Sequence, residues 1–131
     1  MDLHSFLPAD RTPVDEHPFH FHCHPEVSCF LLCCHNVDLL LYPFDVVLLK
    51  KSLGMHSAEF LQKHVIVCPG SHPYFPGIRL KMADTASNPC PFLGEDGCQV
   101  YRSRPSACRT YPLERAVEWH PETKKLQAHY F

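Results

Sequence analysis

Cysteine and histidine are the residues of this chain with the greatest capacity for chemistry. The sequence has eight cysteines and eleven histidines in 131 residues, and thiolate and imidazole are the ligands that zinc, copper and iron–sulfur clusters take from proteins. Seven thiols fall in two groups, Cys23, Cys29, Cys33 and Cys34 in the first, and Cys90, Cys98 and Cys108 in the second. We therefore predict that these seven cysteines bind metal, with buried free thiols as the alternative.

The spacing within the first group bears on how its sulfurs can converge. A helix after Ser28 would place Cys29 and Cys33, four residues apart, on one face, where both could bind one metal ion. Adjacent side chains such as those of Cys33 and Cys34 diverge by about 100° on a helix. The adjacent pair therefore favours two sites, or one ligand beside one buried thiol.

The second group lies in a segment rich in turn-forming residues. Prolines and glycines recur between residues 88 and 112, and they favour irregular backbone that can present thiolates from turns. Arg102, Arg104 and Arg109 flank the thiols. Positive charge of this kind lowers the pKa of a nearby thiol and offsets the charge of a thiolate cluster, although exposed pairs with surface acids would explain the arginines equally well.

Cys68 and three histidines are weaker candidates for metal ligands. Cys68 stands alone in the apolar run HVIVCPG, so we expect it to pack as a small hydrophobic residue. His20, His22 and His24 alternate around Cys23. On a strand the three would share one face, and any one of them could replace a missing thiolate. The alternative is that they are solvated.

The order of these motifs resembles a known family. A cysteine group ending in CC is followed by the runs YPFDVVLLKKSLGM and SAEFLQK, and then by CPFLGEDGCQVYRSRPSACRTYP. This order resembles the YkgJ-type cysteine-cluster family over about residues 20 to 113, although the family's usual C-x2-C-x2-C-C here reads C-x5-C-x3-C-C. The resemblance implies a zinc- or iron-chelating domain, in some relatives linked to oxidoreductase or protein-modifying activity, as in flagellin lysine methylase.

The sulfur ligands suit two kinds of metal centre. Thiolates bind tetrahedral zinc and iron–sulfur clusters alike. Seven of them would fit one fully ligated centre and three further ligands. The radical-cofactor spacing C-x3-C-x2-C is absent, because Asn36 stands where its third cysteine would follow Cys29 and Cys33. We expect an iron–sulfur centre with a redox or protein-modifying role, and a zinc-stabilised binding module without catalysis is the alternative.

Hydrophobic patterning and turn residues predict short elements around the thiols. Pro43 is suited to the first helical turn and Gly54 to the end of that helix. The predicted elements are a strand at 37–41, helices at 43–53 and from an N-cap at Ser57, a strand at 78–82, and a hairpin of 116–120 with 126–131. We expect an extended arm at 1–19 and, at 20–131, a small irregular α+β domain stabilised by metal.

Charge and hydropathy exclude several classes of partner. The net charge of −2 and the pI of about 6.6 lack the basic excess that nucleic-acid binding needs. No apolar stretch approaches the roughly 18 residues of a membrane span, and the first residues do not read as a secretion signal. The chain has no phosphate-binding glycine motif. We expect a cytoplasmic protein that acts on a protein or small molecule.

Overall fold

The computed structural model describes residues 13–14, 18 and 20–131, and the statements below concern those residues. The arm predicted at 1–19 lies almost wholly outside them, so its boundary stays a prediction. By its internal contacts the chain divides into one compact unit of residues 23–109 and another formed by 1–22 with 110–131.

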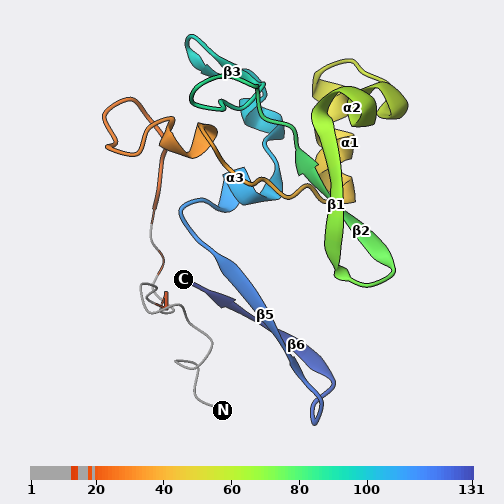
Figure 1. The fold of residues 1–131 in the computed structure, drawn as a ribbon. Helices are drawn as coiled ribbons and strands as arrows, with labels where there is room; N and C mark the ends of the chain where they lie inside the picture. The colour runs from red at the N-terminus through yellow and green to blue at the C-terminus, as the bar shows by residue number, and fades with distance from the viewer. Residues whose placement is uncertain (1–12, 15–17, 19) are drawn as a thin grey trace. The chain divides into compact units, whose positions relative to one another are not determined.

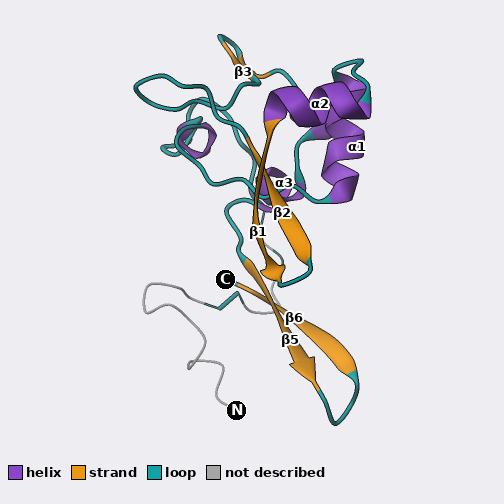
Figure 2. Cartoon of the chain, turned by 45° about the vertical axis from the view of Figure 1, so that its right-hand side comes forward, coloured by secondary structure: helices purple, strands orange, loops and turns teal. Residues whose placement is uncertain are grey.

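Short helices and two-stranded antiparallel sheets make up the described chain, which confirms the predicted α+β class (Figures 1 and 2). None of these helices has the length and apolar composition needed to cross a bilayer. In chain order the elements are η2 (Leu32–Cys34), α1 (Pro43–Ser52), α2 (Ser57–His64), β1 (Val65–His72), β2 (Phe75–Leu80), β3 (Leu93–Gly94), β4 (Gly97–Cys98), η3 (Tyr101–Ser103), α3 (Ser106–Thr110), β5 (Arg115–His120) and β6 (Lys125–Tyr130).

Helix α1 begins and ends where its sequence predicts. Pro43 occupies the first turn, where its missing N–H costs nothing. Asp45 Oδ2 accepts a hydrogen bond from the Tyr42 N–H at 2.9 Å, so a backbone donor just before the helix is satisfied. Leu53 caps the other end, and Gly54 follows with φ 65°. These contacts confirm the helix predicted at 43–53.

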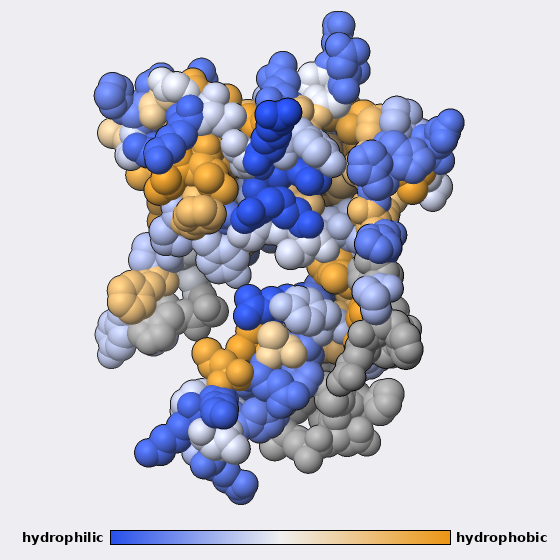
Figure 3. Space-filling model, turned by 180° about the vertical axis from the view of Figure 1, so that it is seen from behind, coloured by the Kyte–Doolittle hydropathy of each residue, from blue (hydrophilic) through white to orange (hydrophobic). Residues whose placement is uncertain are grey.

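Helices α1 and α2 pack on each other and carry much of the small apolar core. Helix α2 starts at Ser57, so its N-cap is His56, one residue earlier than predicted. Leu49 and Phe60 are fully buried. The buried apolar residues are Leu39, Leu41, Val46, Leu49, Phe60, Leu80, Phe92 and Val100. Figure 3 shows apolar side chains at the surface among hydrophilic ones. The buried apolar core is correspondingly small.

Strands β1 and β2 form an antiparallel hairpin after α2. Val65 pairs with Leu80 and Cys68 with Gly77, and the register then shifts before the turn. The sequence predicts no strand at 65–72, because Pro69 and Gly70 are typical of a loop. Gly70 is required there, since a Cβ would lie 2.2 Å from the Phe75 carbonyl oxygen.

The strand predicted at 37–41 is reduced to a bridge. Leu40 pairs with Arg79 as an isolated bridge. The Leu41 N–H donates to Ile78 O and the Leu80 N–H donates to Leu39 O, each at 2.9 Å. The segment therefore lies along β2 without extending into a strand. Strand β2 itself runs from Phe75 to Leu80, three residues earlier at its start than the predicted 78–82.

The other unit contains the β5–β6 hairpin. Its register runs from Arg115 opposite Tyr130 to His120 opposite Lys125, which confirms the hairpin predicted from period-two alternation. The Val14 N–H donates to Tyr130 O at 2.9 Å. Alternation places Trp119 and Leu126, both largely exposed, on one face.

The ionisation of His64 makes the stability of the fold depend on pH. Its ring lies between those of Phe60 and Phe92, with centroid distances of 5.4 and 5.0 Å. Burial, assisted by Lys63, lowers the His64 pKa from 6.5. A lowered pKa means that the stability contributed by neutral His64 is fully present above about pH 6.5. That contribution is lost as the pH falls through the folded pKa.

We expect His64→Gln to flatten part of the decline in unfolding free energy between about pH 8 and 5. Denaturant unfolding of both proteins at several pH values, in reductant, measures the two slopes. His56→Gln, at an exposed N-cap position, is the control and should keep the wild-type slope. Equal slopes for all three proteins would contradict this account of His64.

Candidate metal centre

A short backbone pairing joins the two cysteine groups. The Asn36 N–H donates to Asn88 O at 2.9 Å, and the Cys90 N–H donates to Cys34 O at 2.7 Å. These bonds make residues 34–36 antiparallel to 88–90. Cys34 at the end of η2 is therefore held directly beside Cys90, the first cysteine of the second group.

A tight turn brings the second cysteine of that group back to the first. Leu93 in β3 pairs with Cys98 in β4, and the Leu93 N–H donates to Cys90 O at 3.0 Å. Gly97 has φ 115°, a conformation that side chains disfavour. Glycine at this position thus allows the chain to reverse and places Cys98 near Cys90.

The third cysteine is placed by α3. Val100, just before η3, is buried in the core, and Pro105 is buried before α3. The Ser106 N–H and hydroxyl both donate to Asp45 Oδ1, at 2.9 and 2.8 Å. These contacts fix the start of α3 on α1, and Cys108 follows two residues later, packed against the core.

Electrostatic interactions show that five thiols share one neighbourhood. Burial, together with the neighbouring thiols of Cys33, Cys90 and Cys98, raises the pKa of Cys34 to about 12. Burial likewise raises the pKa of Cys90, and the pKa of Cys108 rises to about 12. Cys33, Cys90 and Cys98 also raise the Cys108 pKa. We call Cys33, Cys34, Cys90, Cys98 and Cys108 the five-cysteine group.

The Cys33 thiol lies close enough to Cys34 to raise its pKa. The expectation that the adjacent pair serves two sites, or one ligand beside one buried thiol, stays a prediction. Both cysteines lie in the 3₁₀ helix η2, which follows Leu31 in the left-handed conformation at φ 61°. Cys29 lies in a turn before that point. The helical face that would have paired Cys29 with Cys33 is therefore absent.

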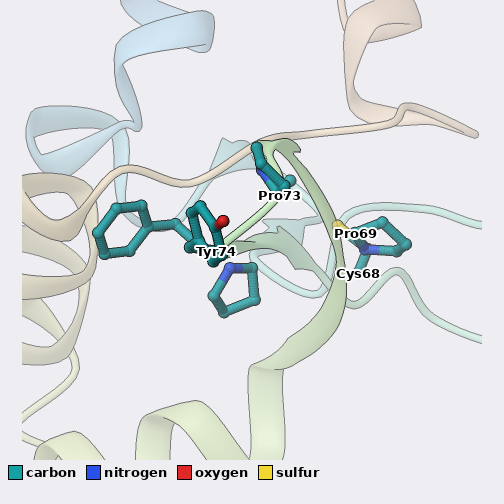
Figure 4. Close-up of a pocket in the computed structure, with 7 residues that line it drawn as sticks. Cys68, Pro69, Pro73 and Tyr74 are labelled. Atoms are coloured by element: carbon teal, nitrogen blue, oxygen red, sulfur yellow. The ribbon is translucent and has the colours of Figure 1, made fainter.

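The remaining cysteines are Cys23, Cys29 and Cys68. All eight cysteines are free and half-buried, and Cys23, Cys29 and Cys68 are not among the main influences on the raised pKa values. Cys68 lies in β1 beside a hollow that Pro69, Pro73 and Tyr74 help to line (Figure 4). A Cβ added to Gly77 on the opposite strand would lie 3.1 Å from the Cys68 sulfur, so glycine leaves room for it.

The three histidines around Cys23 share no strand face, because residues 20–24 have no regular secondary structure. His20 and His22 are exposed, and His24 is half-buried. His24 Nδ1 lies 4.0 Å from Glu26 Oε2. Replacement of a thiolate ligand by one of these histidines stays a prediction.

An imidazole–carboxylate cluster on the β5–β6 hairpin was missed from the sequence. The Nε2 atoms of His120 and His129 lie 3.6 and 3.3 Å from Glu118 Oε2. Glu118 and His120 share a strand face by their spacing of two, and His129 lies opposite Ala116 on the paired strand. The predicted hairpin register was the signal that could have revealed it. The cluster ties the two strands together.

Arg104 supplies positive charge beside the second cysteine group. Its guanidinium carbon lies 3.8 Å from the centre of the Tyr101 ring, and its Nε donates to Tyr101 O at 3.0 Å. Arg104 opposes the rise in the Cys108 pKa, which is the influence on a thiol that the sequence analysis expected of the arginines.

The donor chemistry of the five-cysteine group fits a zinc ion or an iron–sulfur cluster, both of which accept several thiolates. In the described part of the chain, no three or more His, Cys, Asp or Glu side chains stand in positions that could hold a metal ion. The five thiols are thus close neighbours and not a formed ligand shell.

Comparison with known families agrees with this donor set. A cysteine-rich metal-binding domain is the class that the fold and thiols define. The chain matches, over residues 22–126, the CxxCxxCC family, described as a putative zinc- or iron-chelating domain. The chain belongs to this family, which confirms the resemblance and supports binding of zinc or iron. No curated protein and no solved structure matches it.

Metal binding should release protons. The pKa values of Cys34 and Cys108 are about 12, so both are protonated at neutral pH, and a thiol must lose its proton to bind metal. We expect apparent zinc affinity to rise with pH. At about pH 7.5 roughly one proton should be released per bound cysteine.

A zinc titration in weak buffer with a pH-indicator dye measures this release. Cys108→Ser should release about one proton fewer than the wild type, and Cys68→Ser is the matched control that should leave the count unchanged. An unchanged count in Cys108→Ser would contradict the prediction.

Proposed function

We propose that the five-cysteine group holds an iron–sulfur centre that serves a redox or protein-modifying reaction. The observation that carries this proposal is the gathering of five thiols from two distant parts of the chain, which is enough for the four cysteine ligands of a [2Fe–2S] or [4Fe–4S] cluster. An iron–sulfur cluster is held by cysteine thiolates. Cys33, Cys34, Cys90, Cys98 and Cys108 are its proposed ligands.

Charge supports the same proposal. Thiolates taken out of water require a compensating cation, because burial raises the pKa of these thiols. Arg104 stabilises negative charge on Cys108. In iron–sulfur proteins, net charge and solvent exposure set the reduction potential. The thiols are half-buried, which would leave the centre accessible to an electron donor or substrate.

Cys23 and Cys29 complete the proposed set of seven. Cys29 lies in the turns immediately before η2, and its carbonyl accepts the Leu32 N–H at 3.1 Å. A rearrangement of these turns on metal binding would bring further thiolates toward the centre. We propose a reducing, cytoplasmic compartment, since free thiols persist there, and a protein or small molecule as the reaction partner.

A zinc-stabilised module is the second candidate. The elements around the thiols include two-residue strands and a five-residue helix, which are too short to be stable alone. Turns cross-linked by a metal are typical of structural zinc sites. In that case the metal would fold a binding surface and perform no chemistry.

Analysis of protein purified without oxygen separates the two candidates. Iron and acid-labile sulfide in comparable amounts, with broad visible absorption, are expected for the cluster. Cys90→Ser should lose much of the iron, and Cys68→Ser should keep it. Stoichiometric zinc in a colourless protein would refute the cluster and support the zinc module. Protein without metal would refute both.

Removal of the metal should loosen residues 88–110 more than the helical pair. Amides that depend on this segment include those of Cys90, Leu93 and Gln99, whereas Val46 and Leu53 report on α1. Hydrogen exchange with and without chelator measures both sets. We expect a large loss of protection in the first set and a smaller one in the second. Equal loss throughout would mean that the metal supports the whole unit.

A further inference from the structure

Asp45 is a charged residue with no exposed surface. A buried carboxylate is costly unless its oxygens are hydrogen-bonded. Oδ2 accepts the Tyr42 N–H at 2.9 Å, and Oδ1 accepts the Ser106 N–H and hydroxyl at 2.9 and 2.8 Å. One carboxylate therefore joins the first turn of α1 to the start of α3, 61 residues further along the chain.

Only one oxygen of Asp45 is needed by α1 itself. The bond from Tyr42 N–H to Oδ2 completes the helix cap. Capping is also possible for an exposed side chain, so it does not explain burial of the whole carboxylate. The bonds to Oδ1 instead satisfy donors of Ser106. They act on α3, the helix that carries Cys108.

Helix α3 depends on such outside contacts. It has five residues, and an isolated helix of that length is unstable. The Arg109 N–H donates to Pro105 O at 3.1 Å within this turn. Immediately before it, Arg104 is bonded to Tyr101 O. The position of Cys108 thus follows from how residues 104–106 are held.

We propose that Asp45 is a positioning residue for the metal centre, acting through Ser106 to place the Cys108 thiol. This inference rests on the proposed function, because it requires Cys108 to bind the metal. Asp45 is not one of the proposed metal ligands. The Asp45 carboxylate, which lies on α1, holds the start of α3 in place. Helix α1 has ten residues and is anchored in the core by Val46 and Leu49.

Substitutions at the two partners act differently on this contact. Ser106→Ala removes the hydroxyl donor and keeps the backbone N–H bond. Ser106→Thr keeps both donors and should restore affinity. Asp45→Asn replaces one acceptor oxygen with an NH₂ group, which would leave either the Tyr42 or the Ser106 N–H without its acceptor. Phe60→Leu, in the core of α2, is the control for general destabilisation.

Cobalt(II) is the probe, added to the metal-free full chain under reducing conditions. Thiolate-to-cobalt absorption reports sulfur ligation, and competition with a chromophoric chelator gives the dissociation constant. Loss of a residue that orients a metal ligand typically weakens binding about 10–100-fold. We expect Asp45→Asn to weaken cobalt binding by a factor in this range, and Ser106→Ala to weaken it by about 10-fold or less. The cobalt dissociation constants of Ser106→Thr and Phe60→Leu should remain near that of the wild type.

A double-mutant cycle with Cys108→Ser separates positioning from general stability. If Asp45 acts through Cys108, Ser106→Ala should weaken cobalt binding in the wild type and have little further effect in Cys108→Ser. Equal effects in both backgrounds would overturn the inference. So would a Ser106→Ala affinity equal to that of the wild type. This comparison stands even if Asp45→Asn does not fold.

The same data distinguish this inference from the proposed function. Absence of thiolate-to-cobalt absorption in the wild type would refute both. Strong absorption with unchanged affinity in Cys108→Ser would refute the role of Asp45 alone, because the other thiols would then hold the metal without Cys108.

Discussion

The crowding of sulfur away from water is the constraint on which the rest of this structure depends. Five cysteines from two distant parts of the chain share a half-buried neighbourhood, where burial and neighbouring thiols oppose ionisation of Cys34 and Cys108. Such a group is stable in two states only: with its thiols protonated, or with the thiolate charge balanced by a cation. Membership of a zinc- or iron-chelating family makes the second state the functional one.

The rest of this unit supplies rigidity that the thiol-bearing segments lack. Helices α1 and α2 bury Leu49 and Phe60 completely, and α1 also contacts η3. By contrast, the cysteines lie on a 3₁₀ turn, a two-residue strand and a very short helix. Regular structure therefore serves as a support, and irregular structure presents the ligands, since turns can direct neighbouring thiols toward one place.

Features encoded locally were predictable from sequence. Pro43 and Gly54 delimit α1, and period-two alternation marks the β5–β6 hairpin. Features that depend on distant contacts were not. Strand β1 contains Pro69 and Gly70, which resemble a loop and lie where the register with β2 shifts between Cys68 and His72. The prediction that Cys29 and Cys33 share a helical face assumed regular geometry, which Leu31 interrupts. The bond between Asp45 and Ser106 has no sequence signature, because the two residues are 61 positions apart.

The pairing of residues 34–36 with 88–90 also bears on how the molecule reaches its folded state. Asn36 and Asn88 are 52 positions apart, so the intervening chain must close a long loop before the two cysteine groups meet. A metal bridging them acts as a cross-link, and for a loop of this length the loss of unfolded-chain entropy corresponds to about 4 kcal/mol of stabilisation. The metal centre would then hold the two ends of this loop together, and its removal would return conformational entropy to the chain between them.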